Sequence, residues 1–146
     1  MYSEDFKFGR SISDPIYLSI KNTEKSTIYL LLDREIGTND IFIKVRWVYK
    51  NKVKQFKGKE TSLNFQVDQF EIISLMPAKP ARLVSYNLDK SLIEEECVYK
   101  ISEEDFKKIA SAKSVTLMLE GKTENKVAHF NRIHTFKAFR DFLKNS

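Results

Sequence analysis

Residues 41–50, IFIKVRWVYK, alternate between two kinds of side chain, and no other stretch constrains the fold of this chain as strongly. Side chains along an extended strand point to opposite faces in turn, so Ile43, Val45, Trp47 and Tyr49 share one face. The positions between them are mostly Lys or Arg. The pattern predicts a strand with an apolar face in the core and a polar face toward solvent.

Several other runs are rich in β-branched and aromatic residues and predict further strands. They are residues 16–22, 27–33, 82–88, 115–121 and 126–132. The first two runs and the last two runs are each joined by a short polar turn, so each pair is expected to form a hairpin. Residues 91–101, SLIEEECVYKI, are ambiguous between a short helix and an extended edge strand. The prolines of residues 76–82 indicate a surface loop.

Residues 63–72 continue the alternation but change its phase. The apolar positions move from the odd-numbered Leu63, Phe65 and Val67 to the even-numbered Phe70 and Ile72. Because a shift of one residue turns every side chain to the other face, the change predicts a bulge or a short turn near residues 68 and 69.

Two amphipathic helices are expected near the C-terminus. Ser102 can cap a helix over residues 103–112, which has acids in its first turn and apolar residues at helical spacing. Thr135 can cap a second helix over residues 135–145, whose apolar stripe consists of three Phe and one Leu. Both segments carry polar residues on the opposite face, so each helix should cover a face or an edge of the sheet.

The fold expected is α+β, with a mainly antiparallel sheet of about six to eight strands and two helices. The chain has 146 residues, 42% of them hydrophobic, which suffices for one globular domain over residues 1–146. Residues 1–14 are expected to form a loosely ordered N-terminal arm. Helices do not alternate with strands, which argues against a doubly wound nucleotide-binding fold. The sequence has no apolar run of signal-peptide or membrane-spanning length.

Residues 44–59 form a basic stretch with seven cations and no acid, and they are the candidate surface for a polyanion. Clustered cations bind phosphates by releasing condensed counterions. The candidate binding residues are Lys44, Arg46, Lys50, Lys52, Lys54, Lys57 and Lys59. Residues 89–105 oppose them with seven acids and two bases. The positive potential is therefore available only if the acidic segment lies elsewhere in the fold.

Catalytic and metal-binding patterns are weak in this sequence. His129 and His134 are candidate metal ligands, but one is expected in a strand and the other before a helix, so their imidazoles need not converge. Cys97 is the only cysteine, and the acids beside it should raise its thiol pKa. There is no phosphate-binding glycine loop and no nucleophile elbow, so no catalytic residue and no cofactor is assigned.

The sequence from Ile101 to Leu143 carries a helix ending in IASA, a strand VTLMLEG and a closing helix with FL. In these features it resembles the C-terminal portion of small uncharacterised bacterial proteins that are often exported or lipid-anchored. The resemblance implies a fold and a setting in the bacterial cell envelope or periplasm, provided that a signal peptide has been removed. Without such a segment the setting expected is cytoplasmic.

These observations favour a binding or structural module without enzymatic activity, which contacts a protein or an envelope component through an edge strand or a sheet face. The alternative is a polyanion binder that uses the basic 44–59 stretch for nucleic acid or anionic lipid. A weaker alternative is a small metal or thiol enzyme built around Cys97, His129 and His134.

Overall fold

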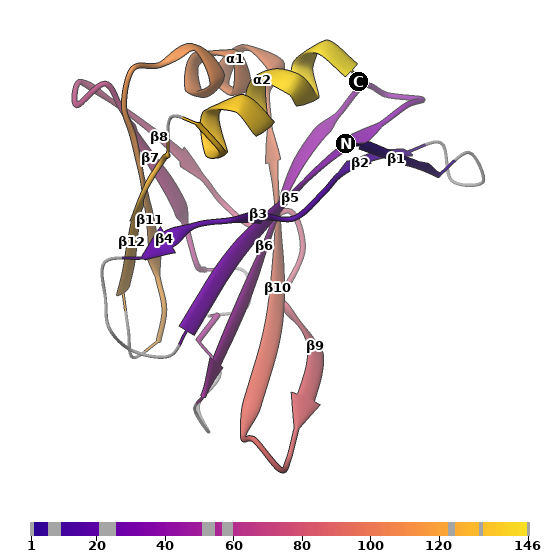
Figure 1. Cartoon of the computed structure of the whole chain (residues 1–146), viewed down its shortest axis with the longest axis vertical. Coiled ribbons are helices and arrows are strands. Elements are labelled where there is room, and N and C mark those ends of the chain that lie inside the picture. The colour runs from indigo at the N-terminus through magenta and orange to yellow at the C-terminus, as the bar shows by residue number, and fades with distance from the viewer. Residues whose placement is uncertain are drawn as a thin grey trace.

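The computed structural model describes residues 2–5, 10–20, 26–50, 55–56, 60–122, 125–131 and 133–145 (Figure 1). Within these residues the chain forms twelve strands and two helices. The strands are β1 (Tyr2–Asp5), β2 (Arg10–Ser13), β3 (Ile16–Tyr17), β4 (Ser19–Ile20), β5 (Ser26–Glu35), β6 (Ile41–Lys50), β7 (Leu63–Val67), β8 (Glu71–Leu75), β9 (Arg82–Asn87), β10 (Leu92–Ile101), β11 (Val115–Glu120) and β12 (Asn125–His129). The helices are α1 (Glu103–Ser111) and α2 (Thr135–Asn145).

The strands form two antiparallel sheets. The large sheet has seven strands in the order β1-β2-β5-β6-β10-β9, with β3 paired to β5, and the small sheet has five in the order β4-β12-β11-β7-β8. The predicted α+β class is confirmed, although the described strands are more numerous than the six to eight expected. β1 and β2 belong to the large sheet, whereas the sequence suggested a loosely ordered arm for residues 1–14.

Two crossing segments join the sheets at their sides. β3 pairs with β5 of the large sheet, and β4, which begins two residues later, pairs with β12 of the small sheet. On the other side the chain leaves β8 of the small sheet, and Pro77 forms a bridge with Tyr99 of β10. The two sheets therefore form a flattened sandwich whose sides are each spanned by continuous chain.

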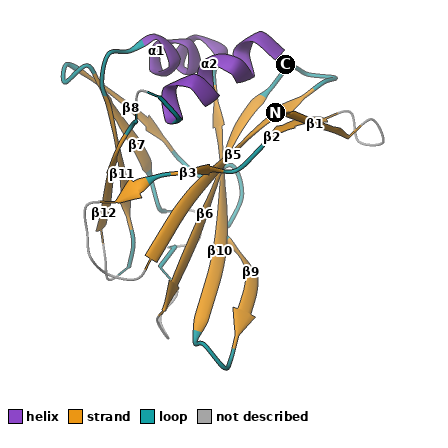
Figure 2. Cartoon of the chain, in the orientation of Figure 1, coloured by secondary structure: helices purple, strands orange, loops and turns teal. Residues whose placement is uncertain are grey.

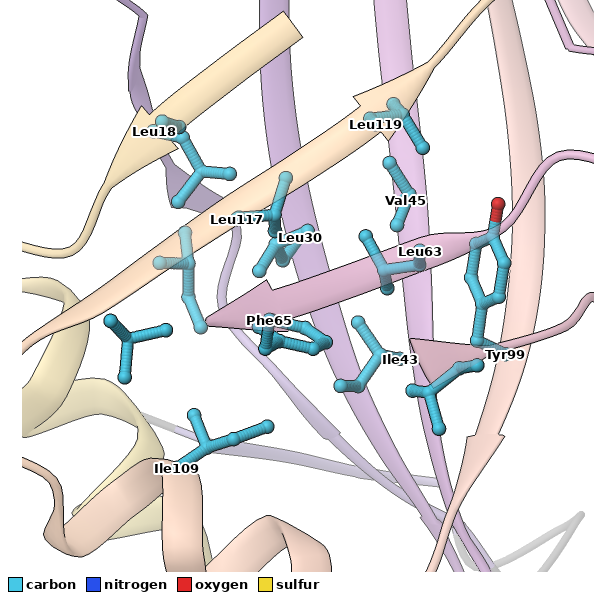
Figure 3. Close-up of a cluster of buried hydrophobic side chains, with 14 of the residues drawn as sticks. Leu18, Leu30, Ile43, Val45, Leu63, Phe65, Tyr99, Ile109, Leu117 and Leu119 are labelled. Atoms are coloured by element: carbon cyan, nitrogen blue, oxygen red, sulfur yellow. The ribbon is translucent and has the colours of Figure 1, made fainter. Parts of the chain in front are cut away.

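The core lies between the two sheets, as Figure 3 shows. Buried side chains of the large sheet, such as Leu30 and Val45, face buried side chains of the small sheet, such as Leu63 and Leu117. Ile43, Val45, Trp47 and Tyr49 of the alternating 41–50 stretch are buried, which confirms the predicted register. Removing such surfaces from water is the main stabilising contribution to the fold.

The helices cover one end of the sandwich (Figure 2). Ser102 caps α1, because its hydroxyl accepts a hydrogen bond from the amide of Asp105 at 3.1 Å. Phe106 of α1 stacks on Phe139 of α2 with ring centroids 5.0 Å apart, and Phe139 lies 5.0 Å from Phe130 beyond β12. The apolar stripes predicted for both helices thus meet in one aromatic cluster.

Two local expectations were wrong, and the turn predicted near residues 68 and 69 was confirmed. β10 is a central strand between β6 and β9 and is neither a short helix nor an edge. The turn predicted near residues 68 and 69 is present, but Phe70 and Ile72 after it point to solvent. Thr135 begins α2 without capping it, because the side chain of Asn131 accepts hydrogen bonds from the two amides that precede the helix.

Candidate functional site

The basic and acidic segments lie side by side in the large sheet. β6 pairs with β10 along its full length, so that Arg46 stands opposite Glu96. The Arg46 guanidinium lies 2.5 Å from a carboxylate oxygen of Glu96 and 3.0 Å from one of Glu94. Lys44 lies 3.4 Å from the buried carboxylate of Asp33 on β5. The charges of both cations are therefore compensated within the sheet.

Of the other predicted polyanion-binding residues, the structure describes only Lys50. Lys50 is exposed at the end of β6. Lys52, Lys54, Lys57 and Lys59 lie outside the described residues. Of the three candidate polyanion-binding residues that the structure describes, only Lys50 thus presents its charge mainly to solvent.

Glu96 has the most strongly constrained carboxylate of this network. Its side chain is buried between Arg46 and Arg82, whose guanidinium lies 3.0 Å from its second oxygen. Burial alone raises the pKa of Glu96, but the hydrogen bonds and charges of the two arginines outweigh burial and hold that pKa below its ordinary value. Arg46, Glu96 and Arg82 thus form a structural ion-pair network on the outer face of the large sheet.

A second carboxylate, Glu95, points to the core side of β10. One of its oxygens accepts hydrogen bonds from the hydroxyl of Tyr49 and from the backbone amide of Gln55 at 2.8 Å. Burial, followed by this hydrogen bond, raises the pKa of Tyr49 above its ordinary value. Glu95 thus holds residues 55–56 at the end of the core, which is a structural role.

The candidates for a thiol or metal enzyme are not brought together. Cys97 is buried on the core side of β10, and burial raises the pKa of its thiol. His129 is exposed on the outer face of the small sheet, whereas His134 precedes α2 and lines a separate hollow beside Asp14 and Ile16. Among the described residues, no group of three or more His, Cys, Asp or Glu could hold a metal ion.

An uncovered strand edge is available at β9. β9 is the last strand of the large sheet, and no described strand pairs with its outer side. In Figure 1, β9 and the adjoining part of β10 project from the end of the sandwich opposite the helices. Leu83 and Tyr86 on β9 are each about half exposed, and Leu88 in the following turn is 76% exposed.

The backbone of Tyr86 faces this open edge. Ala78 donates a backbone hydrogen bond to the carbonyl of Val98. Backbone groups alternate between the two sides of a strand, so the N–H and C=O of β10 residues an even number of positions from Val98 point toward β9. Tyr86 pairs with Ile93, which is an odd number of positions from Val98, so the backbone groups of Ile93 point toward β6. The N–H and C=O of Tyr86 therefore point away from β10, where an added strand can reach them.

A broad hollow lies on the outer face of the small sheet. It encloses about 620 Å³, and its lining includes Gln66, Gln69, Thr116 and His129. Thr116 and His129 are cross-strand partners, and the Thr116 hydroxyl lies 3.0 Å from Nδ1 of His129. Apart from His129, the only residue of the lining with a titratable charge is Lys113.

The sequence contains weak signals for these two surfaces. Residues 82–88 predict a strand, but only the tertiary fold leaves its outer side without a partner. Phe70 follows a tight turn of two consecutive residues with positive φ, Asp68 at 51° and Gln69 at 65°. After this turn Phe70 and Ile72 are exposed, whereas Ile73 is buried. The phase change in residues 63–72 is the local signal for this turn.

No described helix is long and apolar enough to cross a membrane. Comparisons of the chain with protein-family models, with curated proteins and with solved structures give no significant match.

Proposed function

We propose that this protein is a binding module without enzymatic activity that recognises an extended segment of another protein by adding it to the edge of β9. The observation that carries the proposal is the open edge of β9 together with the exposed apolar side chains on and beside it. Strand addition is a common mode of peptide recognition, in which backbone hydrogen bonds supply affinity and side chains supply specificity.

The edge of β9 lacks most of the devices that usually prevent association. Natural edge strands are protected by Lys, by Pro, by bulges or by a covering element. β9 has no Lys or Pro, and only its register shift opposite Glu94 and Glu95 disturbs the ladder with β10. Leu83 and Tyr86 pair with residues on the same face of β10, so they form one apolar side for an incoming strand.

The protein partner expected has apolar side chains at alternate positions, because those would pack against Leu83 and Tyr86. An envelope setting for this partner rests on the resemblance of residues 101–143 and remains part of the proposal. Polyanion binding has less support, because Arg46 and Lys44 are compensated by neighbouring carboxylates.

The test is selection of peptides from a random displayed library on the immobilised protein, followed by calorimetry with the enriched peptides. The matched variants are Tyr86→Pro, which removes the outward amide, and Tyr86→Ala, which keeps that amide and removes only the ring. Proline is tolerated at an edge position whose N–H faces solvent, so both variants are expected to fold. Peptide affinity should fall at least about tenfold more in Tyr86→Pro than in Tyr86→Ala, a difference of about 1.4 kcal/mol.

Amide hydrogen exchange locates the bound peptide. Binding should slow the exchange of the Tyr86 amide, while the amides of β8 exchange as in the free protein. The proposal fails if no peptide is enriched, or if enriched peptides bind Tyr86→Pro as tightly as the unaltered protein.

A further inference from the structure

A line of four side chains crosses the outer face of the small sheet. Ile72 of β8, Gln66 of β7, Thr116 of β11 and His129 of β12 are successive cross-strand partners. Partners in neighbouring antiparallel strands place their side chains on the same face. The four residues therefore form a continuous row, here called the cross-strand row, and three of them line the hollow of about 620 Å³.

Several hydrogen-bonding groups along this row are available to a ligand. The side-chain amides of Gln66 and Gln69 make no hydrogen bond within the described part of the chain, and each offers two donors and one acceptor. His129 uses Nδ1 for Thr116, which leaves Nε2 for another group. Gln66, Gln69 and Thr116 carry no charge, and the lining holds one lysine, Lys113, and no acid, so an ionised ligand would lose its water shell with little compensating charge.

An exposed aromatic ring stands on the turn between β7 and β8, directly after Gln69 and two residues before Ile72 of the row. Phe70 is 96% exposed at the tip of the β7–β8 turn, and Ile72 on the same strand segment is also exposed. Covering a water-exposed phenyl ring with an apolar surface lowers the free energy, because it removes apolar area from water. The C–H face of a pyranose ring is such a surface, and its hydroxyls at the ring edge match amide donors and acceptors.

The turn that carries Phe70 is held in place. The carboxylate of Asp68 accepts hydrogen bonds from the amides of Lys113 at 2.8 Å and Ser114 at 3.1 Å. The Asp68 amide in turn donates to the carbonyl of Ser114 at 2.9 Å. Gln69 keeps a left-handed conformation that costs free energy in a residue other than Gly. A fixed turn reduces the entropy that a ligand must overcome on binding.

We propose that the cross-strand row, together with Phe70 and Gln69, binds a neutral oligosaccharide that lies across the strands of the small sheet. Neighbouring strands lie about 4.8 Å apart, which is close to the advance per residue of an extended 1,4-linked pyranose chain. Each strand then offers one side chain to one sugar unit. A peptide would not gain a backbone ladder here, because the row runs across the strands. The site is independent of the proposed peptide-binding edge.

The experiment titrates the isotope-labelled protein with neutral tetrasaccharides of 1,4-linked glucose, xylose, mannose and N-acetylglucosamine, and monitors backbone and side-chain amide resonances. At least one of the four should shift the side-chain amides of Gln66 and Gln69 in a saturable manner. Phe70→Ala should weaken that binding about tenfold, and Gln66→Ala should weaken it severalfold. Because Phe70 is exposed, its replacement should leave the fold intact.

Two variants serve as controls. Tyr17→Ala removes an exposed aromatic ring from the outer face of the large sheet and should leave the sugar affinity unchanged. Tyr86→Pro should also leave it unchanged, which separates this site from the β9 edge. The proposal is overturned if none of the four sugars shifts the two glutamine amides, or if Phe70→Ala binds as well as the unaltered protein. It is equally overturned if only an acidic tetrasaccharide binds and Lys113→Gln abolishes that binding.

Discussion

Two opposing effects act on the ionised carboxylate of Glu96: burial destabilises it, and two neighbouring arginines stabilise it. Its carboxylate is buried on the outer face of the large sheet, yet Arg46 and Arg82 contact both of its oxygens. The two arginines hold the pKa of Glu96 below the ordinary value, despite the opposing effect of burial. A carboxylate with a lowered folded-state pKa stabilises the fold above the pKa of the unfolded chain, near 4.3, and this stabilisation is lost as the pH falls.

Glu96→Gln should lower the free energy of unfolding by about 3 kcal/mol at pH 7, because it removes the charge that compensates two arginines. Denaturant unfolding between pH 3 and pH 7 is the measurement. The unaltered protein should lose stability as the pH falls from about 5, and the variant should lose less over the same range.

Glu94→Gln is the matched control on the same strand. Glu94 also contacts Arg46, at 3.0 Å, but its side chain is more exposed than that of Glu96. Its loss should cost about 1 kcal/mol or less, as for partly exposed pairs. Equal costs for the two variants would contradict the importance assigned to Glu96.

Cys97 should be unreactive in the folded protein. Its side chain is completely buried, and burial raises the pKa of its thiol, so little thiolate forms at neutral pH. A colorimetric thiol reagent should react with one equivalent in denaturant and with almost none in buffer at pH 8. Rapid reaction of the native protein would revive the thiol-enzyme alternative.

At the scale of elements, the start of α2 depends on Asn131. Its side-chain oxygen accepts hydrogen bonds from the amides of Ile133 at 2.8 Å and His134 at 3.1 Å. Asn131→Ala leaves these amides without that partner and should lower the free energy of unfolding by about 1 kcal/mol. Asn131→Asp keeps the acceptor and should cost much less. Thermal unfolding followed by circular dichroism compares the two variants, and equal losses would refute this role.

The helices could be predicted from the sequence because their signals are local. Ser102, the acids after it and the spacing of Phe106 and Ile109 all lie within three turns of one helix. β10 could not be predicted in the same way. Its three consecutive glutamates are typical of a solvated segment, and they become compatible with a central strand only through Arg46, Tyr49 and other distant partners.

The candidate sites were less predictable than the fold. The basic stretch was visible as composition, but its compensation depends on the pairing of β6 with β10. The cross-strand row combines residues from two strand pairs, β7–β8 and β11–β12, that are far apart in the chain, and no local pattern marks such a row. Phe70 was visible as an apolar residue, yet its exposure follows from the turn at Asp68 and Gln69.

At the scale of the whole molecule, the two sheets and the helices share one core. Segments that cross between the sheets at both sides prevent either sheet from separating without breaking chain pairing. Trp47 lies in the core of the large sheet, whereas Phe139 lies in the aromatic cluster under the helices. A mutation that destabilises the aromatic cluster should therefore also lower the denaturant midpoint reported by Trp47 fluorescence.

Phe139→Ala should lower the free energy of unfolding by about 3 to 5 kcal/mol, because it removes a fully buried ring from between Phe106 and Phe130. Tryptophan fluorescence reports on the large sheet, and far-ultraviolet circular dichroism reports on all elements together. If the chain is one cooperative unit, both signals shift to the same lower denaturant midpoint in Phe139→Ala. Phe70→Ala, which removes an exposed ring, should leave both midpoints in place. Separate midpoints for the two signals would instead show that the helical end unfolds independently of the large sheet.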